Sequence, residues 1–69
     1  MGEQHMDRRE LEEHLRDHNC ELLRHGSKHD VWANRETNAT TTIPRHRTLR
    51  KNTARNICDD LGVPRPGSL

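Results

Sequence analysis

Residues 20–44 have the sequence CELLRH-GSK-HDVWAN-RETN-ATTTI-P. The hyphens separate three segments of strand length from the polar or glycine-containing segments between them, since glycine and serine commonly mark turns. The third segment is rich in Thr and Ile, which favour strands, and Pro44 ends it because proline cannot donate a hydrogen bond to a sheet. We therefore predict strands over 20–25, 29–34 and 39–43. Because both connections are short, we expect an antiparallel meander.

A first helix is predicted before these strands, from Asp7 to His18. Leu11 and Leu15 lie four residues apart and form its apolar face, while the residues between them are charged or polar. Asp7 followed by Glu10 resembles a capping box, in which side chains at the helix start bond to free backbone amides. The pattern is typical of a helix with one buried face.

A second helix is predicted after a basic connection, residues 45–51. Its apolar residues recur at i, i+3, i+4 and i+7, which is the clearest helical periodicity in the chain: Ala54, Ile57, Cys58 and Leu61. Asn52 or Thr53 would cap its start, and Gly62 would end it. Since both helices must bury one face, we predict an α+β fold of order α-β-β-β-α. A three-stranded antiparallel sheet would carry both helices on one face and leave the other open.

The length and composition allow one small domain with a thin core. The chain has 69 residues, of which 28% are hydrophobic and 33% charged, and a domain of this size is marginally stable. We assign residues 1–5 to a leader or tag, 6–63 to the domain and 64–69 to a flexible tail. Trp32 is the only aromatic residue, which excludes an RNA-recognition sheet that stacks several bases on aromatic rings.

The positive charge of the chain is local. The net charge is only +1, yet residues 45–55 contain five basic residues and no acidic one: Arg45, Arg47, Arg50, Lys51 and Arg55. Such a patch suits a polyanion better than a membrane, or it is a solvated face that keeps a small domain in solution. Cys20 and Cys58 are expected to be small buried hydrophobic residues. No apolar run is long enough for a signal peptide or a membrane helix, so we expect a cytoplasmic protein.

The second strand leaves open which of its faces meets the helices. Alternation places His29 and Val31 on one face and Trp32 on the other. If Val31 faces the helices, Trp32 lies on the open face, where it could stack on a base or anchor a partner. If Trp32 faces the helices, it is the largest core residue and His29 is exposed. We favour the second arrangement because the core is thin.

Four segments, in this order, resemble the HicA family. They are Asp7-Arg8-Arg9-Glu10-Leu11, Gly26-Ser27-Lys28-His29, Ile43-Pro44-Arg45-His46, and Asn52-Thr53-Ala54-Arg55-Asn56-Ile57-Cys58 followed by Leu61-Gly62. The resemblance spans residues 6–63 and implies a fold like that of a double-stranded-RNA-binding domain. It also implies a small toxin, an endoribonuclease that cleaves messenger RNA and is neutralised by a HicB-like antitoxin. A homodimer, or a heterotetramer with the antitoxin, is the assembly expected.

Carried over to this chain, the family's essential histidine is His29. Many members place the histidine directly after the small pair, whereas Lys28 stands between Ser27 and His29 here. Histidine suits RNA cleavage because its ordinary pKa of ~6.5 lets it take a proton from a hydroxyl nucleophile and give one to the leaving oxygen. Basic side chains such as Arg24, Lys28 and Arg45 would stabilise the negative charge of the transition state.

The other predicted site residues would bind RNA. They are polar and basic residues around the first turn and in the basic connection: Arg24, Ser27, Lys28, Arg45, His46, Arg47, Arg50 and Lys51. His46 could also be a second acid–base group, and its place relative to His29 is open. We predict no metal and no other cofactor, since the histidine and cysteine spacings fit no zinc-binding motif.

Two other functions fit the same sequence. A non-catalytic module could bind duplex RNA by shape and phosphate contacts through the basic segment 45–55. A protein-interaction domain could take a partner on its open sheet face or on a free strand edge. RNA recovered intact after binding would indicate the first. A small partner encoded nearby would fit the second, and equally a toxin with its antitoxin.

Overall fold

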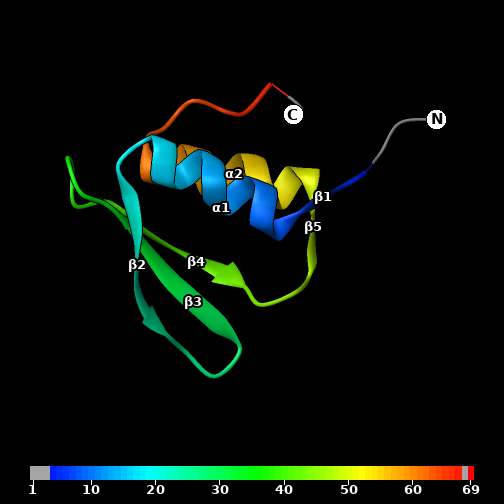
Figure 1. Cartoon of the computed structure of the whole chain (residues 1–69), viewed down its shortest axis with the longest axis horizontal. Coiled ribbons are helices and arrows are strands. Elements are labelled where there is room, and N and C mark those ends of the chain that lie inside the picture. The colour runs from blue at the N-terminus through cyan, green and yellow to red at the C-terminus, as the bar shows by residue number, and fades with distance from the viewer. Residues whose placement is uncertain (1–3, 68) are drawn as a thin grey trace.

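Residues 4–67 and 69, which this computed structural model describes, form two helices, a three-stranded sheet and a short two-stranded ribbon (Figure 1). The elements follow in the order β1 (His5–Asp7), α1 (Arg8–Asp17), β2 (Cys20–His25), β3 (His29–Asn34), β4 (Thr40–Pro44), β5 (Thr48–Arg50) and α2 (Lys51–Leu61). The predicted order of helix, three strands and helix is confirmed, and β1 and β5 are additions to it.

β3 is the central strand of the three-stranded sheet, with β2 and β4 antiparallel on either side. Trp32 pairs with Leu22 of β2 and with Thr41 of β4. Leu23 is an extra residue in β2, at the point where the register shifts. The antiparallel meander is therefore confirmed. β4 includes Pro44 as its last residue, which is possible because β4 is an edge strand.

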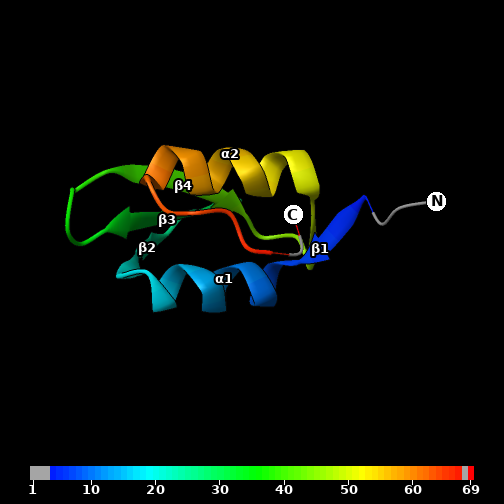
Figure 2. The ribbon, with the colours of Figure 1, turned by 90° about the horizontal axis from the view of Figure 1, so that it is seen from above.

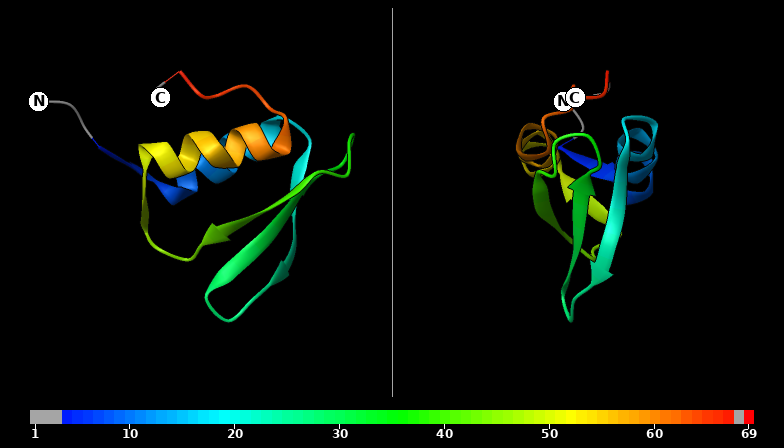
Figure 3. Two further views of the ribbon diagram at one scale, coloured as in Figure 1. Left: turned by 180° about the vertical axis from the view of Figure 1, so that it is seen from behind. Right: turned by 90° about the vertical axis from the view of Figure 1, so that its left-hand side faces the viewer.

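Both helices lie on one face of this sheet. Seen from the end in Figure 3, they stand side by side above the strands, and the view from above in Figure 2 separates them clearly. The core fills the space between the layers and includes Trp32, Leu11, Leu15, Ile43 and Leu61. Trp32 is only 1% exposed, whereas His29 is exposed. The arrangement favoured for β3 and the predicted α+β architecture are both confirmed.

A two-stranded ribbon, which the sequence analysis missed, joins the beginning of the fold to the start of α2. Its strands β1 and β5 pair antiparallel, with Met6 opposite Leu49, and both of these side chains are buried. The amide of Lys51 donates to the carbonyl of Gln4 at 2.9 Å. His5, which the sequence predicts to belong to a leader outside the domain, lies in β1. Strands of three residues are too short for alternation to identify.

The helix ends agree only partly with the predictions. The Asp7 carboxylate accepts a hydrogen bond from the first turn of α1 at 2.9 Å, and Gly62 ends α2 with a left-handed φ of 70°. The prediction of Asn52 or Thr53 as the cap of α2 is wrong. Arg50 holds the cap position without a side-chain cap hydrogen bond. β5 runs directly into α2, and the carbonyl of Gln4, the residue before β1, accepts from the first helical amide.

The C-terminal segment runs along the side of the two helices that faces away from the sheet (Figure 1), over the space between them in the view from above (Figure 2). The His14 ring donates to the carbonyl of Pro64 at 2.6 Å. Arg65 donates two hydrogen bonds to the Asp59 carboxylate, at 3.2 and 2.7 Å. Leu69 packs against the core. The sequence alone predicts a flexible tail here, whereas these contacts attach the segment to the helices.

Asn34 tests the connection between the sheet and α2. Its buried side chain donates from Nδ2 to the Leu61 carbonyl at 2.8 Å and accepts at Oδ1 from the Glu36 amide at 2.8 Å. Asn34→Ala leaves both backbone groups without this partner. We therefore expect the free energy of unfolding, measured by urea denaturation, to fall by about 1–3 kcal/mol. Asn56→Ala, at an exposed position of α2, is the control, with an expected change within about 0.5 kcal/mol. Equal effects of the two changes would contradict this account.

Candidate functional site

The turn between β2 and β3 is closed by its own backbone. The amide of Gly26 donates to the carbonyl of His29 at 2.7 Å, and the chain reverses over Ser27 and Lys28. A Cβ atom at position 26 would overlap the His29 carbonyl oxygen, so this close approach requires glycine. The turn therefore fixes the residue at which β3 begins.

His29 lies on the open face of the sheet, away from the helices. It is exposed and pairs with Pro44 of β4. Arg24 and Val31 form a cross-strand pair two residues further along β3, so they share the open face with His29. Within residues 4–67 and 69, the His29 ring makes no hydrogen bond or ion pair. The ring is therefore accessible to a ligand and has a basic side chain on the same face.

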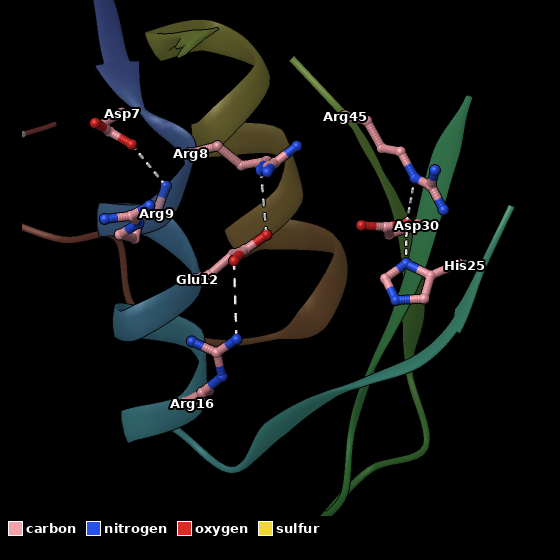
Figure 4. A network of polar contacts seen from close by, with 8 residues as sticks. All are labelled: Asp7, Arg8, Arg9, Glu12, Arg16, His25, Asp30 and Arg45. Carbon is pink, nitrogen blue, oxygen red and sulfur yellow. Dashed lines mark hydrogen bonds and ion pairs between the residues drawn. The ribbon is translucent and has the colours of Figure 1, made fainter. Parts of the chain in front are cut away.

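The inner face of the same end of the sheet carries a buried carboxylate that the sequence analysis missed. Asp30 is 6% exposed, and its Oδ1 accepts hydrogen bonds from His25 Nδ1 and Arg45 Nε, each at 2.9 Å (Figure 4). Alternation places Asp30 on the same face as Trp32, and a buried carboxylate needs donors. The burial of Asp30 could therefore have been predicted from the alternation in β3. The alternation does not identify the two donors, because Arg45 follows a different strand, β4.

Opposing effects set the pKa of Asp30. Burial alone would raise it, but the hydrogen bonds and positive charges of Arg45 and His25 together hold the pKa below its ordinary value. Asp30 is therefore ionised at neutral pH. Because a carboxylate only accepts hydrogen bonds, His25 donates from Nδ1. Its Nε2 is then the ring nitrogen available to an outside partner, on a side chain that is 65% exposed.

Several predicted RNA-binding residues lie around the turn. Arg24 shares the open face with His29, and Ser27 and Lys28 are exposed turn residues. The Lys28 carbonyl accepts a hydrogen bond from the Arg45 amide at 3.3 Å. This bond joins the turn to the loop that follows β4.

The basic connection after β4 divides between two hollows in the surface. Arg45 and Arg47 line one hollow, together with two arginines at the start of α1. Arg47 also lines the other hollow, beside β5, together with His46 and Arg50. Lys51 begins α2. The sequence predicts the basic patch but not its contact with α1, because that contact depends on the pairing of β1 with β5. His46 is placed with Arg50 near β5.

The cysteines, the possible metal ligands and the helices are other candidate sources of function. Cys20 and Cys58 are free and buried, as expected, and burial is the main cause of the raised pKa of each thiol. Both thiols are therefore protonated at neutral pH and are poor nucleophiles. Residues 4–67 and 69 contain no group of three or more His, Cys, Asp or Glu side chains that could hold a metal ion. In the same residues, neither helix is long and apolar enough to cross a membrane.

Asp30→Asn tests whether the buried carboxylate stabilises the fold. Because the pKa of Asp30 is lowered by folding, its ionised form adds stability above the unfolded-state pKa of about 3.9, and this stability is lost as the pH falls through the lower folded-state pKa. We expect the variant to have a smaller free energy of unfolding than the wild type at about pH 7, with the gap narrowing below about pH 4. Urea denaturation across this range measures the gap, and Asp17→Asn at an exposed position is the control. A gap independent of pH would contradict the prediction.

Comparison with known proteins identifies a family. Residues 8–63 match the family described as "HicA toxin of bacterial toxin-antitoxin". The matched segment contains α1, the three-stranded sheet, β5 and α2. It therefore includes the turn between β2 and β3 and the basic connection after β4. No curated protein and no solved structure matches the chain. Since the family match covers most of the chain, this protein belongs to the HicA toxin family.

Proposed function

We propose that this HicA-family toxin is a metal-independent endoribonuclease that cleaves messenger RNA, with His29 as its catalytic residue. The observation that carries the proposal is the position of His29, exposed at the start of β3 directly after the Gly26 turn. An accessible histidine with basic side chains nearby is what acid–base catalysis on a polyanion needs. The family match includes this segment.

His29 would act on the protons of the reacting oxygens. Its neutral ring takes the proton of the attacking hydroxyl as that oxygen bonds to phosphorus, and a protonated group gives a proton to the oxygen that leaves as the P–O bond breaks. Arg24 on the same face and Lys28 in the turn supply positive charge for the phosphate oxygens in the transition state. Arg45 is bound to Asp30 on the inner face, so we do not assign it this role.

The rest of the RNA would be held by phosphate contacts. The residues proposed for this are the basic and polar groups of the turn and of the basic connection, all exposed except the half-buried Lys51: Arg24, Ser27, Lys28, Arg45, His46, Arg47, Arg50 and Lys51. Contacts of this kind position the nucleic acid and do not read its sequence. Binding should therefore weaken as the salt concentration rises.

A HicB-like antitoxin in the cytoplasm is the partner that we propose. Membership of the family implies an antitoxin. The open face of the sheet and the β2 edge are available for it, because Leu22 and Leu23 of this edge strand are 37% and 55% exposed. A partner that covers the open face would also cover His29. A homodimer, or a heterotetramer with the antitoxin, is the assembly proposed.

His29→Ala tests the catalytic assignment. Purified protein is incubated with messenger RNA in EDTA, and cleavage rates are compared on gels. We expect the wild type to cleave the RNA and the variant to be slower by about 10²–10⁴-fold, with an unchanged urea midpoint. His18→Ala is the matched control and should cleave at the wild-type rate, because its ring lies at the end of α1 and bonds to the His14 carbonyl at 2.8 Å.

His25→Ala distinguishes the two histidines of the hairpin. If this change abolishes cleavage and His29→Ala does not, the catalytic role belongs to His25, which Asp30 orients, and the assignment to His29 is wrong. Full activity of His29→Ala, or loss of wild-type activity in EDTA, would also contradict the proposal. Tight binding by the wild type with RNA recovered intact would favour the non-catalytic RNA-binding module.

A further inference from the structure

A hollow of about 240 Å³ lies where the loop after β4 meets the start of α1. Its lining consists of four arginines and one aspartate: Asp7, Arg8, Arg9, Arg45 and Arg47. A hydrogen bond of 2.9 Å from the Arg8 amide to the Arg47 carbonyl holds the two segments together. The lining therefore carries a formal excess of three positive charges, drawn from parts of the chain that are distant in sequence.

Two of these arginines form ion pairs through Nε: that of Arg45 is a hydrogen bond, whereas Arg8 Nε is buried without one. Arg8 Nε lies 3.3 Å from Glu12, and Arg45 Nε donates to Asp30 at 2.9 Å (Figure 4). A guanidinium has five N–H donors in a planar fork, so a contact at Nε leaves its terminal amino groups available. These ion pairs limit the movement of both side chains, and so a ligand would lose less side-chain entropy in binding them.

The other two arginines have no such partner. In the part of the chain that the structure describes, the side chains of Arg9 and Arg47 make no ion pair, and both residues are exposed. Glu12 and Asp30 balance the charges of Arg8 and Arg45. The charges of Arg9 and Arg47 are left to repel each other, which costs free energy unless an anion sits between them. The single aspartate is already engaged, because its carboxylate caps the Arg9 amide at 2.9 Å.

The arginine side chains, and not the backbone at the helix start, would form the contacts. The amides of Arg8 and Arg9 already have acceptors in the Arg47 carbonyl and the Asp7 carboxylate. The positive end of the α1 dipole still adds some attraction for an anion. The hollow is smaller than the ~300–1,000 Å³ typical of pockets for drug-sized ligands, so it suits one charged group of a longer molecule.

We infer that this hollow binds a phosphate group of the RNA backbone, at a position separate from the scissile phosphate. Arginine forks match phosphate oxygens in pairs, and a phosphodiester is the charged group that repeats along the proposed substrate. The inference rests on the proposed function. The bond between the Arg45 amide and the Lys28 carbonyl connects the hollow's loop to the turn before His29, so an RNA strand seated in the hollow is held near that turn.

The double variant Arg9→Gln/Arg47→Gln tests this site. Affinity for a single-stranded RNA oligonucleotide is measured at several salt concentrations in the His29→Ala background, where the RNA stays intact. We expect at least ~10-fold weaker binding at about 0.1 M salt, and a log–log salt dependence shallower by about 1.4, or 0.7 for each lost contact. Arg35→Gln/Arg65→Gln removes the same charge outside the hollow and should leave the salt dependence nearly unchanged.

Asp7→Asn is the converse test, since it removes the one negative group of the lining. Asparagine caps a helix as well as aspartate does, so α1 is preserved. Because the Asp7 carboxylate repels a phosphate, its removal should tighten RNA binding by about twofold to fivefold. A purely structural role of the hollow predicts no gain. Trp32, which is buried in the core, reports by its fluorescence that each variant is folded.

The results separate this inference from the proposed function. If Arg9→Gln/Arg47→Gln binds RNA like the charge-matched control, the hollow is not an RNA site, although cleavage that depends on His29 would still stand. If the double variant keeps its RNA affinity but loses binding to an acidic protein partner, the hollow is a protein-docking site and the inference is overturned. If RNA binding needs the hollow but no variant or wild type cleaves, the hollow remains a phosphate site and the nuclease assignment fails.

Discussion

The burial of Trp32 on the inner face of β3 is the constraint on which the rest of the fold depends. Its side chain is the largest in the core and is 1% exposed beneath the two helices. A slip of one residue in strand register would expose Trp32 and turn His29 inward. Losing the contacts of a buried tryptophan costs about 3–5 kcal/mol, a large part of the ~5–15 kcal/mol that holds a small domain together. The packing of one side chain therefore decides which face presents His29.

The same register places two polar residues in the interior. Asp30 and Asn34 stand two residues before and after Trp32 and are buried with it. Asn34 is satisfied at one end of β3 by the Leu61 carbonyl, which ties the sheet to the end of α2. Asp30 is satisfied at the other end by His25 and Arg45, which ties the turn and the loop after β4 to the sheet. The polar contacts that position the candidate site thus follow from the burial of Trp32.

The sequence predicts those parts of the structure that repeat along the chain. The first helix with Leu11 and Leu15 on its apolar face, the three strands and the C-terminal Gly62 of α2 follow from periodicity and turn residues. The β1–β5 ribbon could not be predicted, because its strands are too short to show alternation and pair residues from opposite ends of the domain. For the same reason the sequence predicts Arg45 and Arg47 as binding residues, but it does not predict that Arg8 and Arg9 lie beside them. The exposure of His29 follows from alternation once Trp32 is assigned to the core. The hydrogen-bond partners of Asp30 can be identified only from the tertiary structure.

A net charge of +1 underestimates what this protein offers to a polyanion. Many charges are paired locally: Glu12 lies between Arg8 and Arg16, and Asp30 accepts from Arg45. A bound phosphate responds to the charges within about one Debye length, ~8 Å at physiological salt, and to the donors that it can reach. An ion pair at Nε cancels much of an arginine's charge but leaves most of its donors free to bind phosphate oxygens. Composition counts charges and not donors, so a nearly neutral chain can still present a specific site for phosphate.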